Sequence, residues 1–156
     1  MMRILRLLGS IGLCQAAGGL GALITMDAVP GWYAGLAKPT FAPPNWLFGP
    51  VWITLYTMMG VAFFLILESE KSRDRRNAVR LFLGQLALNA LWTPLFFGLK
   101  WMFAAFLEIL LLMALIVAAM RVFYRIRKTA GVLLLPYALW VAFAAALNLS
   151  LFLLNR

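Results

Sequence analysis

The stretch that decides the fold is VRLFLGQLALNALWTPLFFGL, from Val79 to Leu99. As a helix rising about 1.5 Å per residue, it is long enough to cross a hydrocarbon layer of ~30 Å. Four of its polar and aromatic residues recur at steps of four, three and four, which places them on one helical face: Gln85, Asn89, Trp92 and Phe96. Amides inside a bilayer need hydrogen-bond partners, so this face is predicted to point into a helix bundle.

The composition favours a membrane protein throughout. Of the 156 residues, 65% are hydrophobic and 12% are charged, whereas about half and about a quarter are usual in soluble domains. Five apolar runs are long enough to span, and strand-like alternation is absent from them. The predicted fold class is therefore an all-α membrane protein, a bundle of five transmembrane helices forming one domain over residues 1–156. The spans are expected at about 7–26, 46–67, 79–99, 102–120 and 132–154, with 27–45 as an ordered loop over a pocket.

The first span has a second interpretation, because MMRILRLLGSIGL has the basic start and apolar middle of a signal peptide. Its apolar part continues through CQAAGGLGALITM, beyond the about 7 to 15 residues of such a peptide, which favours a retained helix. Gly12, Ala16 and Gly19 form a stripe of small residues in this span. We expect this stripe to pack closely against another helix.

The basic residues predict the orientation of the bundle. With five spans, eleven of the 14 lysines and arginines fall on one side, in the N-terminus and the segments 68–80 and 121–130. The positive-inside rule places this side in the cytoplasm and the 30–46 loop and the C-terminus outside. The net charge of +9 does not indicate a nucleic-acid partner, since these residues flank spans and are expected to contact anionic lipid. The expected location is a bacterial cell membrane, as an integral multi-pass protein.

Several kinds of chemistry are excluded by what the chain lacks. Cys14 is the only cysteine and there is no histidine, so neither a disulfide nor a cysteine metal cluster is expected, and the commonest general base is missing. We expect no metal site and no resident cofactor. The sequence also shows no acid/base machinery. Glu108 is the sole acid within a span, and we expect it to have a structural role between helices.

Aromatic and amide side chains gather near one end of the predicted spans. Trp52 and Tyr56 lie one turn apart, and the last span carries a stripe of Tyr137, Trp140, Ala144 and Asn148. With Trp92, these residues predict a pocket for a large, flat, mostly apolar ligand near the outer side. Asn89 and Asn148 have the alternative role of bridging helices. Trp32, Trp46 and Trp101 are more typical of interfacial anchors.

The segment from Pro30 to Trp52, PGWYAGLAKPTFAPPNWLFGPVW, is unusually rigid. Its prolines, among them Pro39, Pro43 and Pro44, fix φ and hold an extended path, so the segment is predicted to act as a lid. Lys38 at its centre is a candidate partner for an acidic group on the ligand, and the alternative is an exposed loop lysine.

Four motifs, in this order and spacing, resemble the translocator protein (TspO) family, also called the peripheral-type benzodiazepine receptor family. They are WYAGLAKP followed by PP.W (Trp32–Trp46), GPVWITLY (Gly49–Tyr56), GQLALNALWTPLFFG (Gly84–Gly98) and PYALWVAFAAALN (Pro136–Asn148). The resemblance implies five packed helices, often in a homodimer, and a pocket under the first loop. The family's ligands are tetrapyrroles such as protoporphyrin IX, sterols in animal members and benzodiazepine-type drugs.

Carried onto this sequence, the family pocket implies the residues Tyr33, Pro43, Trp52, Asn89, Trp140 and Ala144. The leading hypothesis is a tetrapyrrole receptor or carrier in which the macrocycle stacks on Trp52 and Trp140 and its propionates lie near Lys38. One alternative is light-dependent porphyrin degradation with Trp52 and Trp140 as electron donors. Another is a sterol-binding, lipid-binding or stress-regulatory role.

Three positions depart from the family pattern. Phe41 replaces a frequent tryptophan in the loop. Leu149 stands where animal members have the tyrosine of a proposed cholesterol motif, which argues against that kind of sterol recognition. Arg80 occupies the position four residues before Gly84, where a glycine would help two copies of this span to pack closely.

Overall fold

The structure, a computed structural model, describes residues 1–156 and contains helices and no strands. Five helical segments are long and apolar enough to cross a membrane, which confirms the predicted all-α class with five spans. The main helices are α1 (Met2–Ala28), α2 (Phe48–Leu67), α3 (Arg73–Thr93), α4 (Met102–Ile126), α5 (Lys128–Leu133) and α6 (Leu135–Leu154). Shorter turns are η1 (Tyr33–Gly35), η2 (Asn45–Leu47) and the π-helical turn η3 (Pro94–Gly98).

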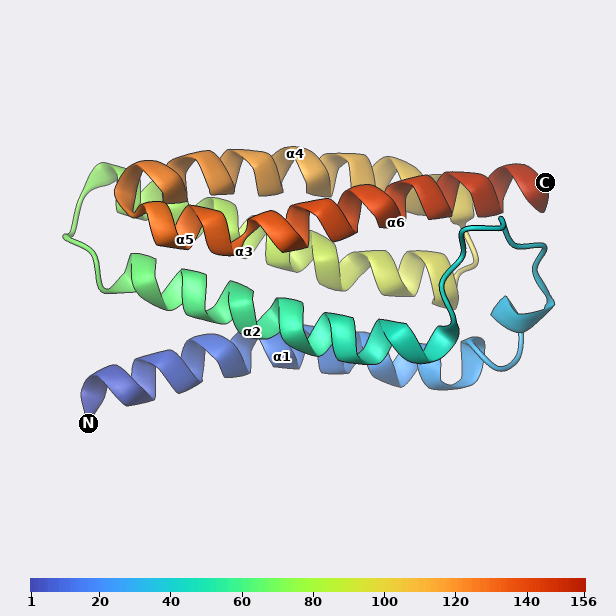
Figure 1. The fold of residues 1–156 in the computed structure, drawn as a ribbon, viewed down its shortest axis with the longest axis horizontal. Helices are drawn as coiled ribbons and strands as arrows, with labels where there is room; N and C mark the ends of the chain where they lie inside the picture. Colours follow the sequence, from blue (N-terminus) through green and yellow to red (C-terminus); the bar gives the residue numbers. More distant parts are fainter.

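The helices lie side by side along one long axis (Figure 1). The N-terminus, the link between α2 and α3 and the junction of α4 with α5 lie at one end of the bundle. The long loop between α1 and α2, the turn before α4 and the C-terminus lie at the other. We call these the basic end and the loop end, because the arginine-rich segments 68–80 and 121–130 fall at the first.

Helix α3 begins well before the apolar run that identified it. Ser72 caps its N-terminus, and the Ser72 Oγ accepts a hydrogen bond of 3.1 Å from the Arg75 backbone N–H. Such a cap satisfies one of the free N–H groups of the first turn, and arginine is a good helix former. The helix therefore runs through the charged residues that precede the predicted span.

Glycine allows α1 and α2 to pack backbone to backbone. A Cβ on Gly60 would lie 2.5 Å from the Ile11 Cα, and one on Gly18 would lie 2.2 Å from the Tyr56 ring. The stripe predicted for this contact is wrong: Gly12 and Gly19 are exposed, and nothing lies within 4 Å of a Cβ built on either. Small residues recur along several faces of α1, so their spacing alone did not identify the packed face.

The half of the bundle at the basic end is filled by side chains. Phe63 of α2 stacks on Phe82 of α3 with ring centroids 4.3 Å apart, and Phe82 stacks on Phe123 of α4 at 5.8 Å. Met59, Ile66 and Ile116 are fully buried around these rings. The interior of this half is thus a close-packed core.

An ionic contact joins α1 to the end of α2. The Glu68 carboxylate accepts hydrogen bonds from Arg3 Nε at 2.8 Å and from Arg6 Nη1 at 2.9 Å. The hydrogen bond from Arg6, together with Arg3, lowers the pKa of Glu68 below its usual value. Because the pKa of Glu68 is lower in the folded protein than in the unfolded chain, the contact stabilises the fold at pH values above the ordinary glutamate pKa of about 4.3. This stabilisation is lost as the pH falls through the pKa of the folded protein.

We predict that Gly60→Ala destabilises the protein by about 1 to 3 kcal/mol, because the new methyl group would overlap the α1 backbone and force the two helices apart. Gly12→Ala is the matched control, since it adds the same group to a helix face with no neighbour. Thermal unfolding of the purified protein in detergent compares the two. Equal midpoints for both variants would contradict the close contact at Gly60.

Candidate functional site

A cavity of about 570 Å³ opens in the loop-end half of the bundle. It is bounded by α1, α2, α3, α4 and α6, with the loop residue Tyr33 at its loop end. Its lining is mostly apolar and aromatic and contains no charged residue. The volume lies within the range of about 300 to 1,000 Å³ that is typical of small-molecule sites. The lining is typical of such sites too, because it has few polar groups among many apolar ones.

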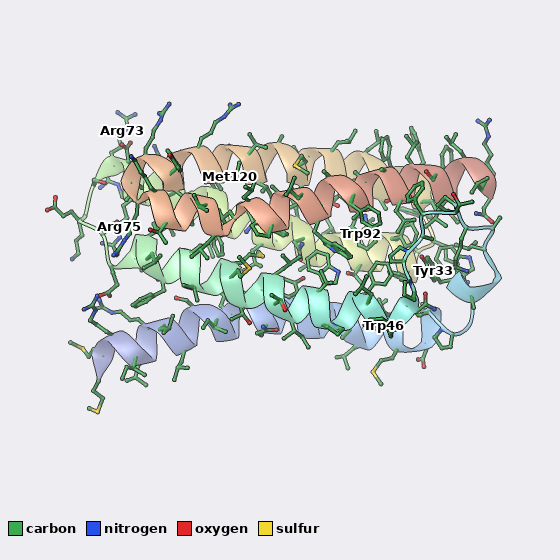
Figure 2. The ribbon with its side chains drawn as sticks, in the orientation of Figure 1. Tyr33, Trp46, Arg73, Arg75, Trp92 and Met120 are labelled. Atoms are coloured by element: carbon green, nitrogen blue, oxygen red, sulfur yellow. The ribbon has the colours of Figure 1, made fainter.

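Seven of the nine residues predicted for ligand binding line this cavity. Figure 2 shows two of them, Tyr33 near the loop and Trp92 deeper in the bundle. The seven are Tyr33, Trp52, Asn89, Trp92, Trp140, Ala144 and Asn148. The structure does not bring Lys38 or Pro43 to the lining.

Trp52 and Trp140, the two tryptophans predicted to stack on a flat ligand, both lie among other aromatic side chains. Trp52 stacks on Tyr56 with centroids 5.2 Å apart, and Trp140 packs against Phe48 at 5.9 Å and Phe143 at 5.3 Å. The Trp140 Nε1 is buried and has no hydrogen-bond partner in the protein. Buried N–H groups are nearly always paired, so this donor is available to a ligand acceptor.

Asn89 is the centre of a polar network across three helices. Its Oδ1 accepts a hydrogen bond from the Tyr56 hydroxyl of α2, and its Nδ2 donates to the Tyr137 hydroxyl of α6 at 3.1 Å. Tyr137 in turn donates to Gln85 Oε1 at 2.7 Å. Asn89 therefore bridges helices, the alternative role considered for it, while also lining the cavity.

Asn148 makes a second bridge. Its Oδ1 accepts from Trp92 Nε1 at 3.2 Å, and its Nδ2 donates to the Met102 carbonyl at 2.8 Å. These bonds join α6 to the end of α3 and the start of α4. They also fix the Trp92 ring, which stacks on Phe96 with centroids 4.9 Å apart.

Lys38 is held by its own loop. Its Nζ donates to the carbonyls of Ala34 at 3.0 Å and Leu36 at 3.3 Å, and it lies 4.9 Å from the Tyr33 ring centroid. Lys38 is exposed and lies outside the cavity lining, and its contact with an acidic ligand group stays a prediction. The short-range carbonyls and the aromatic face satisfy the ammonium group locally.

The loop itself is anchored at two points. Tyr33 is buried, and burial raises the pKa of its hydroxyl, which therefore stays protonated and has no partner in the protein. Asn155, just after α6, accepts from the Ala37 backbone N–H and donates to the Ala37 carbonyl, both at 2.9 Å. The sequence analysis missed this clasp, because a single asparagine near a chain end carries no recognisable pattern.

The π-helical turn η3 was also missed. Pro94 follows Thr93 directly, and the backbone bonds from Leu99 N–H to Pro94 O and from Trp101 N–H to Leu95 O close the wider turn. The turn places the consecutive residues Phe96 and Phe97 both at the cavity. Trp32 is half-buried and packs edge-on against both rings, so it is part of this aromatic cluster. Trp46 and Trp101, in contrast, are 71% and 59% exposed.

The exposed part of the lining marks the mouth of the cavity. All its exposed residues belong to the second half of α1 with the residues just after it, or to η2 and the start of α2, among them Gly19, Met26, Asn45 and Ile53. The mouth therefore lies on the flank of the bundle between α1 and α2, near the loop. Gln15 of α1 closes its deeper edge by donating to the Ile53 carbonyl at 2.9 Å and to Thr57 Oγ1 at 3.0 Å.

Glu108 was expected to have a structural role between helices, for which one form would be a hydrogen bond to another helix. Both of its carboxyl oxygens are buried and neither has a hydrogen-bond partner, so it forms no such bridge.

The fold and the site together define a class: a five-helix membrane protein that encloses an aromatic cavity beneath an ordered loop. The sequence matches the TspO/MBR family over residues 10–154. The protein belongs to this family, as the motif resemblance indicated.

Relatives from distant organisms cover most of the chain. It is 42% identical over 154 residues to the tryptophan-rich protein TspO of Archaeoglobus fulgidus, covering 99% of both chains. It is 36% identical over 145 residues to the tryptophan-rich sensory protein of Cereibacter sphaeroides, covering 93% of this chain and 88% of that one. It is 41% identical over 119 residues to the human translocator protein, covering 75% and 70%.

We predict that Asn155→Ala frees the loop at Ala37, so that the Ala37 amide exchanges its hydrogen about fivefold faster, as expected from a net loss of ~1 kcal/mol. Hydrogen exchange followed by mass spectrometry measures this. Ser150→Ala is the control, because the Ser150 Oγ donates only to Ala146 of its own helix. Unchanged exchange in Asn155→Ala would show that the clasp does not hold the loop.

Proposed function

We propose that the protein is a membrane receptor or carrier for a flat tetrapyrrole such as protoporphyrin IX, bound in the aromatic cavity. The observation that carries the proposal is the lining: two indoles, Trp52 and Trp140, share one uncharged cavity of about 570 Å³. Large aromatic faces favour a planar, mostly apolar ligand by stacking and by exclusion of water.

The polar atoms of the cavity support the same ligand class. The Trp140 Nε1 and the Tyr33 hydroxyl are buried donors without protein partners. A ligand that presents a few acceptors among apolar surface would satisfy them. Because no charged side chain lines the cavity, the ligand's carboxylates would stay at the mouth between α1 and α2, in contact with water or lipid headgroups.

We predict that Trp140→Ala weakens protoporphyrin IX binding by about 1 to 3 kcal/mol through lost stacking area. Trp140→Phe keeps an aromatic ring but removes the N–H, and we expect a smaller loss of about 0.5 to 1.5 kcal/mol. Titration of the purified protein, followed by the absorbance of the porphyrin itself, measures both.

Trp46→Phe is the matched control, since Trp46 is exposed and outside the lining. Its affinity should equal that of the unmodified protein. Unchanged binding in Trp140→Ala would remove the indole from the site. Equal losses in the Trp46 and Trp140 variants would mean that the porphyrin binds non-specifically.

The alternative, light-dependent porphyrin degradation, rests on the same placement of Trp52 and Trp140 in one cavity. Illumination of the bound porphyrin in air distinguishes the two functions. Products that disappear in Trp52→Phe and Trp140→Phe, although the porphyrin still binds, would favour the enzyme. Unchanged pigment would leave binding alone.

We also propose that the basic end faces the cytoplasm of a bacterial cell membrane, because eleven of the 14 basic residues lie there. The only cysteine, Cys14, is buried, so a Cys14→Ser background allows single-cysteine labelling. In intact cells an impermeant maleimide should label Thr40→Cys, and it should label Asn77→Cys only after permeabilisation. The reverse pattern would invert the orientation.

A further inference from the structure

A second cavity, of about 520 Å³, lies at the basic end, remote from the aromatic site. Its walls come from the end of α2, the link to α3 and the first turns of α3. Four cations contribute to the lining: Lys71, Arg75, Arg76 and Arg80. We call this cavity the basic pocket; its other lining residues are Leu67, Ser72 and Val79.

The four cations of the basic pocket have no anionic partner in the protein. No acidic residue lines the pocket. The protein's two ion pairs both use Glu68, whose carboxylate is bound by Arg3 and Arg6 of α1. A concave surface with four unpaired positive charges concentrates positive potential and favours an anion that can accept several charge-assisted hydrogen bonds.

The spacing of the pocket residues keeps the cations together. Counted from the N-cap Ser72, Arg75, Arg76, Val79 and Arg80 lie three, four, seven and eight residues further on, which places them along one side of α3. Arg75 is half-buried although it is charged. Figure 2 shows Arg75 beside the link between α2 and α3 and Arg73 at the outer edge of the same end. Arg73 does not line the pocket, so neighbouring arginines of one turn differ in their surroundings.

Two features favour a lipid over a small free anion. Leu67 is the last residue of a helical segment long and apolar enough to cross a membrane, so the pocket adjoins the end of an apolar span. Leu67 and Val79 give it an apolar wall, which a phosphate ion would leave unused. The volume of the pocket is also more than tenfold the ~30 Å³ that one water occupies. The pocket is therefore much larger than a phosphate group needs.

We propose that the basic pocket binds the phosphate headgroup of an acidic phospholipid, with the upper acyl chains against Leu67 and Val79. The site is independent of the tetrapyrrole cavity. It faces the leaflet that the positive-inside rule assigns to the cytoplasm, where anionic lipid is concentrated.

Native mass spectrometry of the detergent-purified protein tests the proposal with dioctanoyl phosphatidylglycerol. We expect saturable binding of one lipid, at least tenfold tighter than dioctanoyl phosphatidylcholine. Removing a cation should weaken binding about fivefold, so the double variant Arg75→Gln with Arg76→Gln should lose about 25-fold. Arg73→Gln is the matched control, with the same charge change in the same turn, and should stay within twofold.

Thermal unfolding checks that the variants are folded. If the double variant does not fold, the single variants Arg76→Gln and Arg80→Gln, both of exposed side chains, carry the test. Equal weakening in Arg73→Gln, or equal affinity for phosphatidylcholine, would overturn the proposal in favour of diffuse attraction. Competition by inorganic phosphate or glycerophosphoglycerol as strong as that of the lipid would overturn it in favour of a small-anion site.

Discussion

The structure depends on one constraint: polar groups inside a lipid-embedded bundle must find partners within the protein. The network of Tyr56, Asn89, Tyr137 and Gln85, which joins α2, α3 and α6, meets it for every side-chain polar atom but the Gln85 Nε2. Because these hydrogen bonds run between three helices, they restrict the rotation of the helices about their axes. It also lies at the boundary between two halves of the molecule. On its basic side the phenylalanine core fills the bundle, and on its loop side the cavity begins.

The same constraint explains why so much of the fold could be predicted. Apolar runs that cross lipid must be helices, and Gln85 and Asn89 must face inward, which also directs Trp92 and Phe96 to the interior. The structure places all four residues at buried or half-buried positions. Helical spacing likewise assigned Trp140, Ala144 and Asn148 to one face, and the predicted topology brought Trp52 to the same end of the bundle; all four line the cavity. Inside a membrane, a polar residue that shares a helical face with aromatic residues therefore predicts which side of the helix points into the bundle, as well as which residues are buried.

The features that the sequence did not place lie where this constraint is weak. Lys38 is in a loop outside the spans, so water and nearby carbonyls can satisfy it and nothing in the sequence directs it to the cavity. Helix α1 has small residues on several faces, and which face packs is decided by partners such as Ile11 and Tyr56 that spacing does not reveal. The π-helical turn depends on how Pro94 alters the backbone bonds of its neighbours, and a proline alone does not distinguish a kink from a widened turn.

Helix α1 shows how a weakly buried element can still define the site. Only 17% of the most apolar stretch of α1 is buried inside the protein, compared with 39% of the corresponding stretch of the span that contains α2. Its first half is nevertheless fixed, by Glu68 at the N-terminal end and by the contact between Ile11 and Gly60. Beyond Gln15, the inward side of α1 faces the cavity, and its exposed lining residues border the mouth. The helix is thus held along the packed half of the bundle and forms one wall of the open half. One helix therefore contributes both to the close-packed half of the bundle and to the wall of a cavity that opens on the flank of the bundle.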